Sequence, residues 1–209
     1  PAITDKLVIF STAGGVVYGL DPTSGSEIWR FTPKDRGLSG EGCNVCTVSL
    51  TSPILANGIV YIGSWDNNLY ALNAEIGKEV WRFKTNNSIM DDPAIANGLV
   101  YFGDNGGLLH ILDAETGELV QRVNTLTQRP RHTYSSTRVT TPAVEGDTVF
   151  ITNGSLSALN HETGEEIWRK DIDDFWHGST KRPLIDEQFI YTIDDEHSVY
   201  AIDKMTGEL

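Results

Sequence analysis

The sequence is poor in cysteine, in basic residues and in long apolar runs, and each shortage argues against a class of protein. Two cysteines cannot form the disulfide framework of a small secreted domain. Lysine and arginine number 16 against 29 aspartates and glutamates, and the net charge of −13 disfavours nucleic acid and acidic membrane surfaces as partners. No apolar run approaches the roughly 18–20 residues of a membrane-spanning helix. What remains is a globular domain whose acidity suits a basic partner or a cation.

Aromatic residues, by contrast, are plentiful, and they recur in a fixed pattern. The 209 residues include 5 Trp, 7 Tyr and 7 Phe, which argues against disorder and for a sizeable core. No segment shows a sustained period of 3.6 residues, so we expect very little helix. The pattern occurs in five copies, which begin at Pro1, Pro53, Pro93, Pro142 and Pro183.

Each copy contains four short runs typical of strands, here called A to D. Their residues are apolar or aromatic at near alternation, as in LYAL and EVWRF of the second copy. Asn57-Gly58 is typical of a hairpin between strands A and B, and Glu115-Thr116-Gly117 of a turn between C and D. Four strands in a unit of about 40 residues are typical of a β-propeller blade.

We therefore predict an all-β chain, a β-propeller of four-stranded antiparallel blades in which the fifth is incomplete. One blade cannot bury both its faces alone, so the blades should stack on one another. The fifth copy lacks its strand D, which favours a segment of a longer propeller, with self-association through open blade edges as the alternative. The predicted blades are about residues 1–31, 53–83, 93–123, 142–170 and 183–209, with long loops at 32–52 and 124–141.

Alternating strand directions send the A–B and C–D turns to one end of each blade and the B–C and D–A connections to the other. The A–B and C–D turns are short and stereotyped, whereas the D–A connections include the long segments 32–52 and 124–141. Long loops in a tight repeat are usually functional or disordered. A functional site is therefore expected at the end that carries the B–C and D–A connections.

Acidic side chains in the B–C turns form the first candidate group at that end. Carboxylates can hold a hard cation such as calcium, which takes about six to eight oxygen ligands. Aspartate equally suits a hairpin turn, because its carboxylate bonds to its own backbone. The candidate metal ligands are Asp66, Asp104, Asp194 and Glu196.

Basic and aromatic side chains in two D–A connections form the second candidate group. Arginine pairs bidentately with carboxylates, so the group suits an anionic ligand or a carboxylate-bearing peptide. The alternative is a solvated loop that pairs with Asp171, Asp173 and Asp174. The candidate binding residues are Arg129, Arg131, His132, Tyr134, Arg138, Trp176, His177, Lys181 and Arg182.

The two cysteines, Cys43 and Cys46, form a C-x-x-C motif in the first long loop. This spacing fits a small structural disulfide, a pair of free thiols, or a redox or metal site. Thr47 stands where c-type haem attachment requires histidine, so that cofactor is excluded. No second C-x-x-C is present, which makes the zinc signal weak.

The repeated G-x-(V/I)-Y-x-G … L-Y-A-L-(D/N)-A-x-T-G-K-E-x-W-R-F pattern closely resembles the pyrroloquinoline-quinone-like (PQQ-like) propeller repeat, found in quinoprotein alcohol dehydrogenases and BamB-like proteins. The resemblance covers all five copies and implies a periplasmic, secreted or cell-surface location. It also implies a docking role for the tryptophan of the T-G-x-x-x-W segment, which pins adjacent blades. These docking residues are Trp29, Trp81 and Trp168. Gln121 departs from the pattern in the third copy, which predicts an altered junction there.

The sequence lacks a G-x-S-x-G elbow, a phosphate-binding loop and an H-E-x-x-H motif, and no catalytic residue is predicted. We expect a non-catalytic binding or scaffold propeller with a protein or peptide partner, or further blades, and no cofactor. The alternatives are part of a PQQ-dependent dehydrogenase, with calcium and PQQ, or a ligand-sensing ectodomain. In quinoproteins the cofactor lies under a disulfide of adjacent cysteines, and the separation of Cys43 from Cys46 departs from that arrangement.

Overall fold

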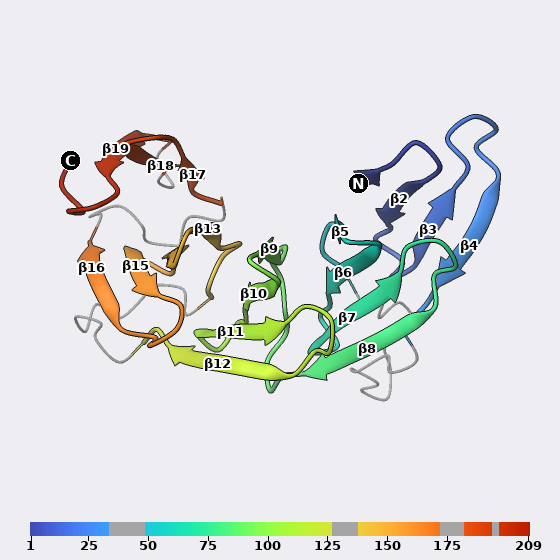
Figure 1. Cartoon of the computed structure of the whole chain (residues 1–209), viewed down its shortest axis with the longest axis horizontal. Helices are drawn as coiled ribbons and strands as arrows, with labels where there is room; N and C mark the ends of the chain where they lie inside the picture. Colours follow the sequence, from blue (N-terminus) through green and yellow to red (C-terminus); the bar gives the residue numbers. More distant parts are fainter. Residues whose placement is uncertain (34–48, 127–137, 172–181, 194–196) are drawn as a thin grey trace. The chain divides into compact units, whose positions relative to one another are not determined.

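The computed structural model describes residues 1–33, 49–126, 138–171, 182–193 and 197–209. Every regular element in these ranges is a β-strand, and none is a helix of the length and apolarity that a membrane span requires. The strands form five separate antiparallel sheets (Figure 1). The prediction of an all-β propeller fold built from four-stranded blades is confirmed. The chain divides into two compact units, residues 1–92 and 93–209, each of which is described by itself.

The first unit contains two four-stranded sheets, each with its strands in chain order. Short turns join consecutive strands, so each sheet is a simple meander. The strands of the first sheet are β1 (Ala2–Ile3), β2 (Val8–Ser11), β3 (Val17–Leu20) and β4 (Glu27–Phe31). Those of the second are β5 (Ile54–Ala56), β6 (Ile59–Gly63), β7 (Asn68–Asn73) and β8 (Glu79–Lys84).

The second unit contains two four-stranded sheets and one of three strands, which is the fifth copy without its strand D. The third sheet has β9 (Ala94–Ala96), β10 (Leu99–Gly103), β11 (Leu108–Asp113) and β12 (Leu119–Asn124). The fourth has β13 (Ala143–Glu145), β14 (Thr148–Thr152), β15 (Leu156–Asn160) and β16 (Glu166–Lys170). The fifth has β17 (Leu184–Ile185), β18 (Phe189–Ile193) and β19 (Val199–Asp203).

The apolar core lies between facing sheets. In the first unit, Ile9 and Val17 of the first sheet pack with Ile62 and Leu72 of the second. β6 and β14 are buried along almost their whole length, whereas burial alternates along β18. Alternation is the pattern of a sheet covered on one face, and continuous burial is the pattern of a sheet covered on both.

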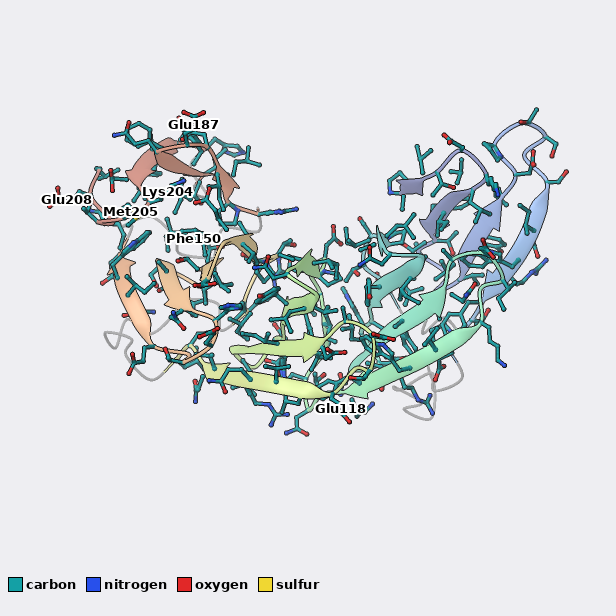
Figure 2. The ribbon with its side chains drawn as sticks, in the orientation of Figure 1. Glu118, Phe150, Glu187, Lys204, Met205 and Glu208 are labelled. Atoms are coloured by element: carbon teal, nitrogen blue, oxygen red, sulfur yellow. The ribbon has the colours of Figure 1, made fainter. Side chains whose placement is uncertain are left out.

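In the second unit, one core joins the third sheet to the fourth and another joins the fourth to the fifth. Leu109 and Val149 belong to the first of these cores. Phe150 and Ile202 belong to the second, where Phe150 points from the fourth sheet toward the fifth (Figure 2). The fourth sheet therefore uses opposite faces for its two neighbours, with Val149 and Ile151 on one face and Phe150 on the other.

The turn between strands C and D is the most regular feature of the repeat. In the third copy, Oδ1 of Asp113 accepts hydrogen bonds from the amides of Glu115 and Thr116 and from the Thr116 hydroxyl. Gly117 closes the turn at φ 74°, a conformation that favours glycine. The same acceptor is supplied by Asp21, Asn73, Asn160 and Asp203 in the other copies. The D-x-x-T-G motif is therefore a self-bonded turn that starts strand D.

The Asp113 turn should contribute to acid sensitivity. The amide and hydroxyl of Thr116 lower the pKa of the Asp113 carboxyl below its usual 3.8. A lowered folded-state pKa gives stability that is complete above the unfolded value and is lost as the pH falls through the folded one. Asp113→Ala should lower the midpoint of thermal unfolding at pH 7. Asp113→Asn should retain the midpoint at pH 7, as Asn73 and Asn160 do the same task, and should lose less stability below pH 4. Thermal melts at pH 7 and pH 3 test this, and equal acid sensitivity of wild type and Asp113→Asn would contradict it.

Candidate functional site

The B–C turns and the D–A connections lie at one end of each blade, which we call the loop-rich end. Hydrogen bonds tie the two kinds of connection together there. The amide of Thr85 donates to the carbonyl of Asn67 at 2.8 Å, and that of Thr125 donates to Gly107 at 3.1 Å. At the opposite end, the amide of Ala74 in a C–D turn donates to Gly58 in an A–B turn at 2.9 Å.

Asp66 lies in the B–C turn of the second blade and is only 2% exposed. Its Oδ1 accepts hydrogen bonds from the backbone and side-chain amides of Asn68, both at 3.0 Å. Its Oδ2 accepts the hydroxyl of Tyr70 at 2.7 Å. Burial and this bond raise the pKa of Tyr70, so the tyrosine remains a proton donor to the carboxylate. Asp66 thereby joins its turn to strand C.

Asp104 plays a comparable part in the third blade. Its Oδ1 accepts the amides of Gly106 at 2.9 Å and Leu108 at 3.0 Å, and its Oδ2 lies 3.2 Å from Nε2 of His110. Burial alone would raise the pKa of the Asp104 carboxyl, but the hydrogen bonds from His110 and the two amides outweigh it and lower the pKa. The His110 ring stacks on Phe102 with a centroid separation of 4.9 Å.

The carboxylate oxygens of Asp66 and Asp104, the two described candidate metal ligands, therefore already accept hydrogen bonds from their own turns and from strand C. Within the described ranges, no group of three or more His, Cys, Asp or Glu side chains is placed to hold a metal ion. Asp194 and Glu196 lie outside those ranges, so a metal site that includes them stays a prediction.

Most of the candidate binding group also lies outside the described residues, namely Arg129, Arg131, His132, Tyr134, Trp176, His177 and Lys181. Cys43 and Cys46 lie outside them as well. Of the binding group, Arg138 is described and half-buried, and Arg182 is described and exposed. Both border the segments that carry the rest of the group.

Trp65 is a candidate that sequence reasoning missed. It lies in the B–C turn of the second blade and is 45% exposed, whereas Trp29 is buried. Its amide donates to the carbonyl of Ser49 at 3.1 Å, which attaches the turn to the preceding D–A connection. The sequence signal is a tryptophan in a B–C turn, between Ser64 and Asp66, where the docking pattern does not require one.

Tryptophan docking joins blades at the opposite end. Trp29 of β4 donates from Nε1 to the carbonyl of Ala74 in the next blade at 2.9 Å. Its ring covers Gly77, where an added Cβ would lie 2.4 Å from a ring carbon and φ is 65°. Trp168 repeats the arrangement, with Nε1 donating to Lys204 at 3.0 Å and its ring over Gly207. These glycines leave the space that the indole fills.

Trp81 lies with its ring centroid 5.8 Å from that of Tyr61 in its own blade, much as the ring of Trp168 lies 6.0 Å from that of Phe150. In the third copy Gln121 stands in place of the tryptophan, and a Cβ added to Gly164 of the next blade would lie 3.0 Å from Nε2 of Gln121. A cavity of about 360 Å³ lies beside it, between the third and fourth blades.

The whole chain, residues 1–209, matches the family described as outer membrane protein assembly factor BamB. The chain belongs to this family. The fold of BamB from Moraxella catarrhalis superposes on 98% of the chain with a TM-score of 0.73 and 19% identity. Quinohemoprotein alcohol dehydrogenase from Comamonas testosteroni superposes on 99% of it with a TM-score of 0.79 and 22% identity. At these identities, the structures show that this BamB-family chain shares their fold.

Sequence similarity extends from the BamB family to quinohemoprotein alcohol dehydrogenases. The enzyme of Comamonas testosteroni is 38% identical over 86 residues, which is 41% of this chain and 12% of the enzyme. The enzyme ADH-IIG of Pseudomonas putida is 31% identical over 170 residues, which is 81% of this chain and 18% of the enzyme. The chain also covers 60% of the BamB structure and 41% of the Comamonas structure. It therefore spans only part of the length of each of these relatives.

Docking through Trp29 should be a main source of stability in the first unit. Trp29→Ala should lower the free energy of unfolding by about 3–5 kcal/mol, because it leaves a cavity between two sheets. Trp29→Phe should cost less than Trp29→Ala, since it keeps a ring and loses the bond to Ala74. Chemical denaturation measures both. Trp65→Ala is the matched control and should change stability by less than about 0.5 kcal/mol, because the side chain is exposed. Equal losses at the two positions would contradict the docking role.

Proposed function

We propose that this chain is a non-catalytic binding module that contacts a protein or peptide through its loop-rich end. The observation that carries the proposal is the use of Asp66 and Asp104, whose buried carboxylates bond to their own turns. Acids committed to turn structure are poorly placed for acid–base chemistry or for a hard cation. At this end of the blades, the D–A connections are the part that differs in length and sequence from one copy to the next.

Charge and family membership support this choice of partner. The chain carries a net charge of −13, yet the candidate binding group in segments 124–141 and 172–182 contains basic side chains that can pair with carboxylates. Trp65 adds an exposed aromatic side chain at the same end of its blade. Tryptophan and arginine are the residue types that most often dominate binding at protein interfaces. The BamB family is described as an assembly factor for outer membrane proteins, which fits a scaffold role outside the cytoplasm.

An acidic peptide is the direct probe of the basic group. Removing Arg129, Arg131 and Arg138 together, by substitution with alanine, should weaken binding of a fluorescent oligoglutamate peptide at least about tenfold, because charged hydrogen bonds are lost. Fluorescence anisotropy at 50 mM and 200 mM salt measures the effect.

The matched control removes the same charge from three strand-D arginines, Arg30, Arg82 and Arg122, and should leave affinity within about twofold. Two of the three pair locally, Arg30 with Glu27 and Arg82 with Glu79. Equal weakening in both triple variants would show that only net charge matters and would overturn the proposed surface.

A second candidate function, as part of a quinoprotein dehydrogenase, is favoured by the similarity to quinohemoprotein alcohol dehydrogenases. A PQQ site of this kind would include calcium ligands. The carboxylate oxygens of Asp66 and Asp104 already accept hydrogen bonds from their own blade, so these two residues are poorly placed to bind calcium. The chain incubated with PQQ and calcium and then desalted should retain no quinone absorbance. Retention of one quinone per chain would favour the second function.

A further inference from the structure

The junction between the third and fourth blades lacks the large aromatic side chains of the first junction. There, Phe31 and Tyr70 meet edge to face with ring centroids 5.3 Å apart. Tyr70 is opposite Arg82 in the strand pairing, and Ser157 is opposite Arg169 in the same way. Val123 follows Gln121 by two residues, as Phe31 follows Trp29. The third junction therefore has valine and serine where the first has phenylalanine and tyrosine.

At this junction a larger side chain of the third blade fills part of the volume that the missing tryptophan would occupy. The residue opposite Trp29 in its own sheet is Gly19, and the residue opposite Gln121 is Ile111. The larger Ile111 is fully buried and occupies part of the space that an indole would take. Nothing comparable offsets the small side chains of Val123 and Ser157, and both line the cavity of about 360 Å³.

The cavity combines an apolar floor with a charged wall. Val123, Ile151 and Leu159 supply apolar surface, and Arg169 and Glu166 supply the charges. Its volume falls near the lower end of the roughly 300–1,000 Å³ of small-molecule sites.

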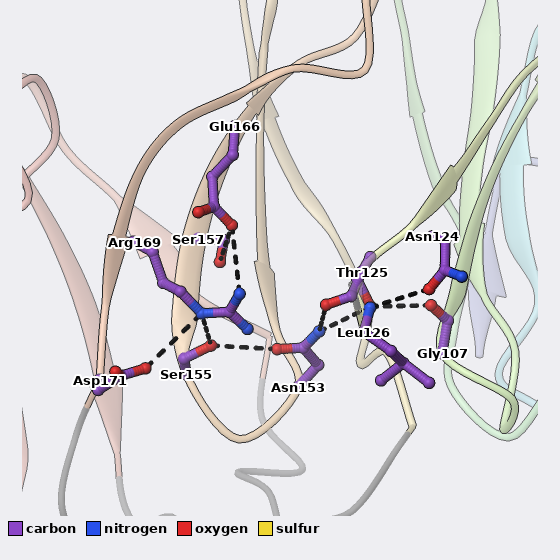
Figure 3. Close-up of polar contacts among 10 residues, drawn as sticks. All are labelled: Gly107, Asn124, Thr125, Leu126, Asn153, Ser155, Ser157, Glu166, Arg169 and Asp171. Carbon is purple, nitrogen blue, oxygen red and sulfur yellow. Dashed lines mark hydrogen bonds and ion pairs between the residues drawn. The ribbon is translucent and has the colours of Figure 1, made fainter. Parts of the chain in front are cut away.

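A chain of hydrogen bonds holds Arg169 in place (Figure 3). Nε of Arg169 donates to the Ser155 hydroxyl at 2.8 Å, and that hydroxyl donates to Oδ1 of Asn153 at 3.2 Å. Nδ2 of Asn153 donates to the Thr125 hydroxyl in the third blade at 2.7 Å. The Arg169 side chain is only 12% exposed. Because the chain of hydrogen bonds ends at Thr125, residues of both blades fix its position.

The charged wall retains one donor and one acceptor. Nη1 of Arg169 lies 3.5 Å from Oε2 of Glu166, which also accepts the Ser157 hydroxyl at 3.3 Å. Among the described residues, Nη2 of Arg169 and Oε1 of Glu166 have no hydrogen-bond partner. Glu165 and Asp171 lie nearby as well, so the acids outnumber the base and an anionic ligand is disfavoured.

We propose that this cavity binds a small neutral aromatic molecule of the phenol class, whose ring fills the space left by Val123 and Ser157. The hydroxyl oxygen accepts a hydrogen bond from Nη2 of Arg169. The guanidinium also attracts the ring through its charge. The inference does not rest on the proposed function, because Val123, Ser157 and Arg169 lie on the strands β12, β15 and β16.

Phenol itself is the probe, titrated by calorimetry and by thermal shift of the full chain. We expect saturable one-site binding with a dissociation constant on the order of 1 mM, as for a ligand of seven non-hydrogen atoms. Toluene, cyclohexanol and benzoate should each bind at least about tenfold more weakly, since toluene lacks the hydroxyl, cyclohexanol lacks the aromatic ring and benzoate carries a charge.

Val123→Phe restores the residue of the first junction and should abolish phenol binding while raising the unfolding midpoint. Val120→Phe is the matched control, because it adds the same side chain to the same strand at a position that is 55% exposed. It should leave affinity within about twofold. Should Val123→Phe not fold, Ser157→Tyr fills the same cavity from the fourth blade. The absence of saturable binding, equal affinity in the filled and control variants, or binding of toluene or cyclohexanol as tight as that of phenol would overturn the proposal.

Discussion

The packing of an indole onto a glycine of the next blade is the contact on which the rest of the structure depends. A four-stranded sheet of this size cannot bury both faces by itself, so each blade relies on its neighbour. Trp29 and Trp168 reach across to carbonyls at Ala74 and Lys204, and their rings cover Gly77 and Gly207. The glycine serves the turn through its positive φ and the neighbour through its missing side chain. One short motif therefore specifies a turn inside a blade and an interface between blades.

The turns explain what many of the acidic residues do. Asp21, Asp113 and Asp203 accept backbone amides in C–D turns, and these bonds lower the pKa of each carboxyl. Asp66 and Asp104 do the same task in B–C turns and in addition hold a strand-C side chain. Carboxylates used in this way stabilise the repeat. In the function we propose, recognition falls to the connections whose length and composition vary between copies.

The third blade junction shows how a repeat can exchange packing for a cavity. Substitution of one docking tryptophan by Gln121 coincides with a larger residue, Ile111, on the same sheet, and the backbone arrangement persists. The remaining volume lies between Val123 and Ser157, next to a guanidinium that is positioned by a chain of three hydrogen-bonded residues. A buried charge is costly to leave unpaired, and Arg169 is held by hydrogen bonds that reach into both blades.

The sequence by itself determined the strands, the copies and the fold, because alternation, hairpin signals and the T-G-x-x-x-W segment are local patterns that recur. It also identified Gln121 as a departure. Only the tertiary structure decided what that departure produces, since Ile111, Val123, Ser157 and Arg169 lie on four strands of two blades and meet through packing alone. The same holds for Asp66 and Asp104, which as letters suit a cation as well as a turn. Hydrogen-bond partners and burial, which are properties of the folded chain, assign their oxygens to the turns.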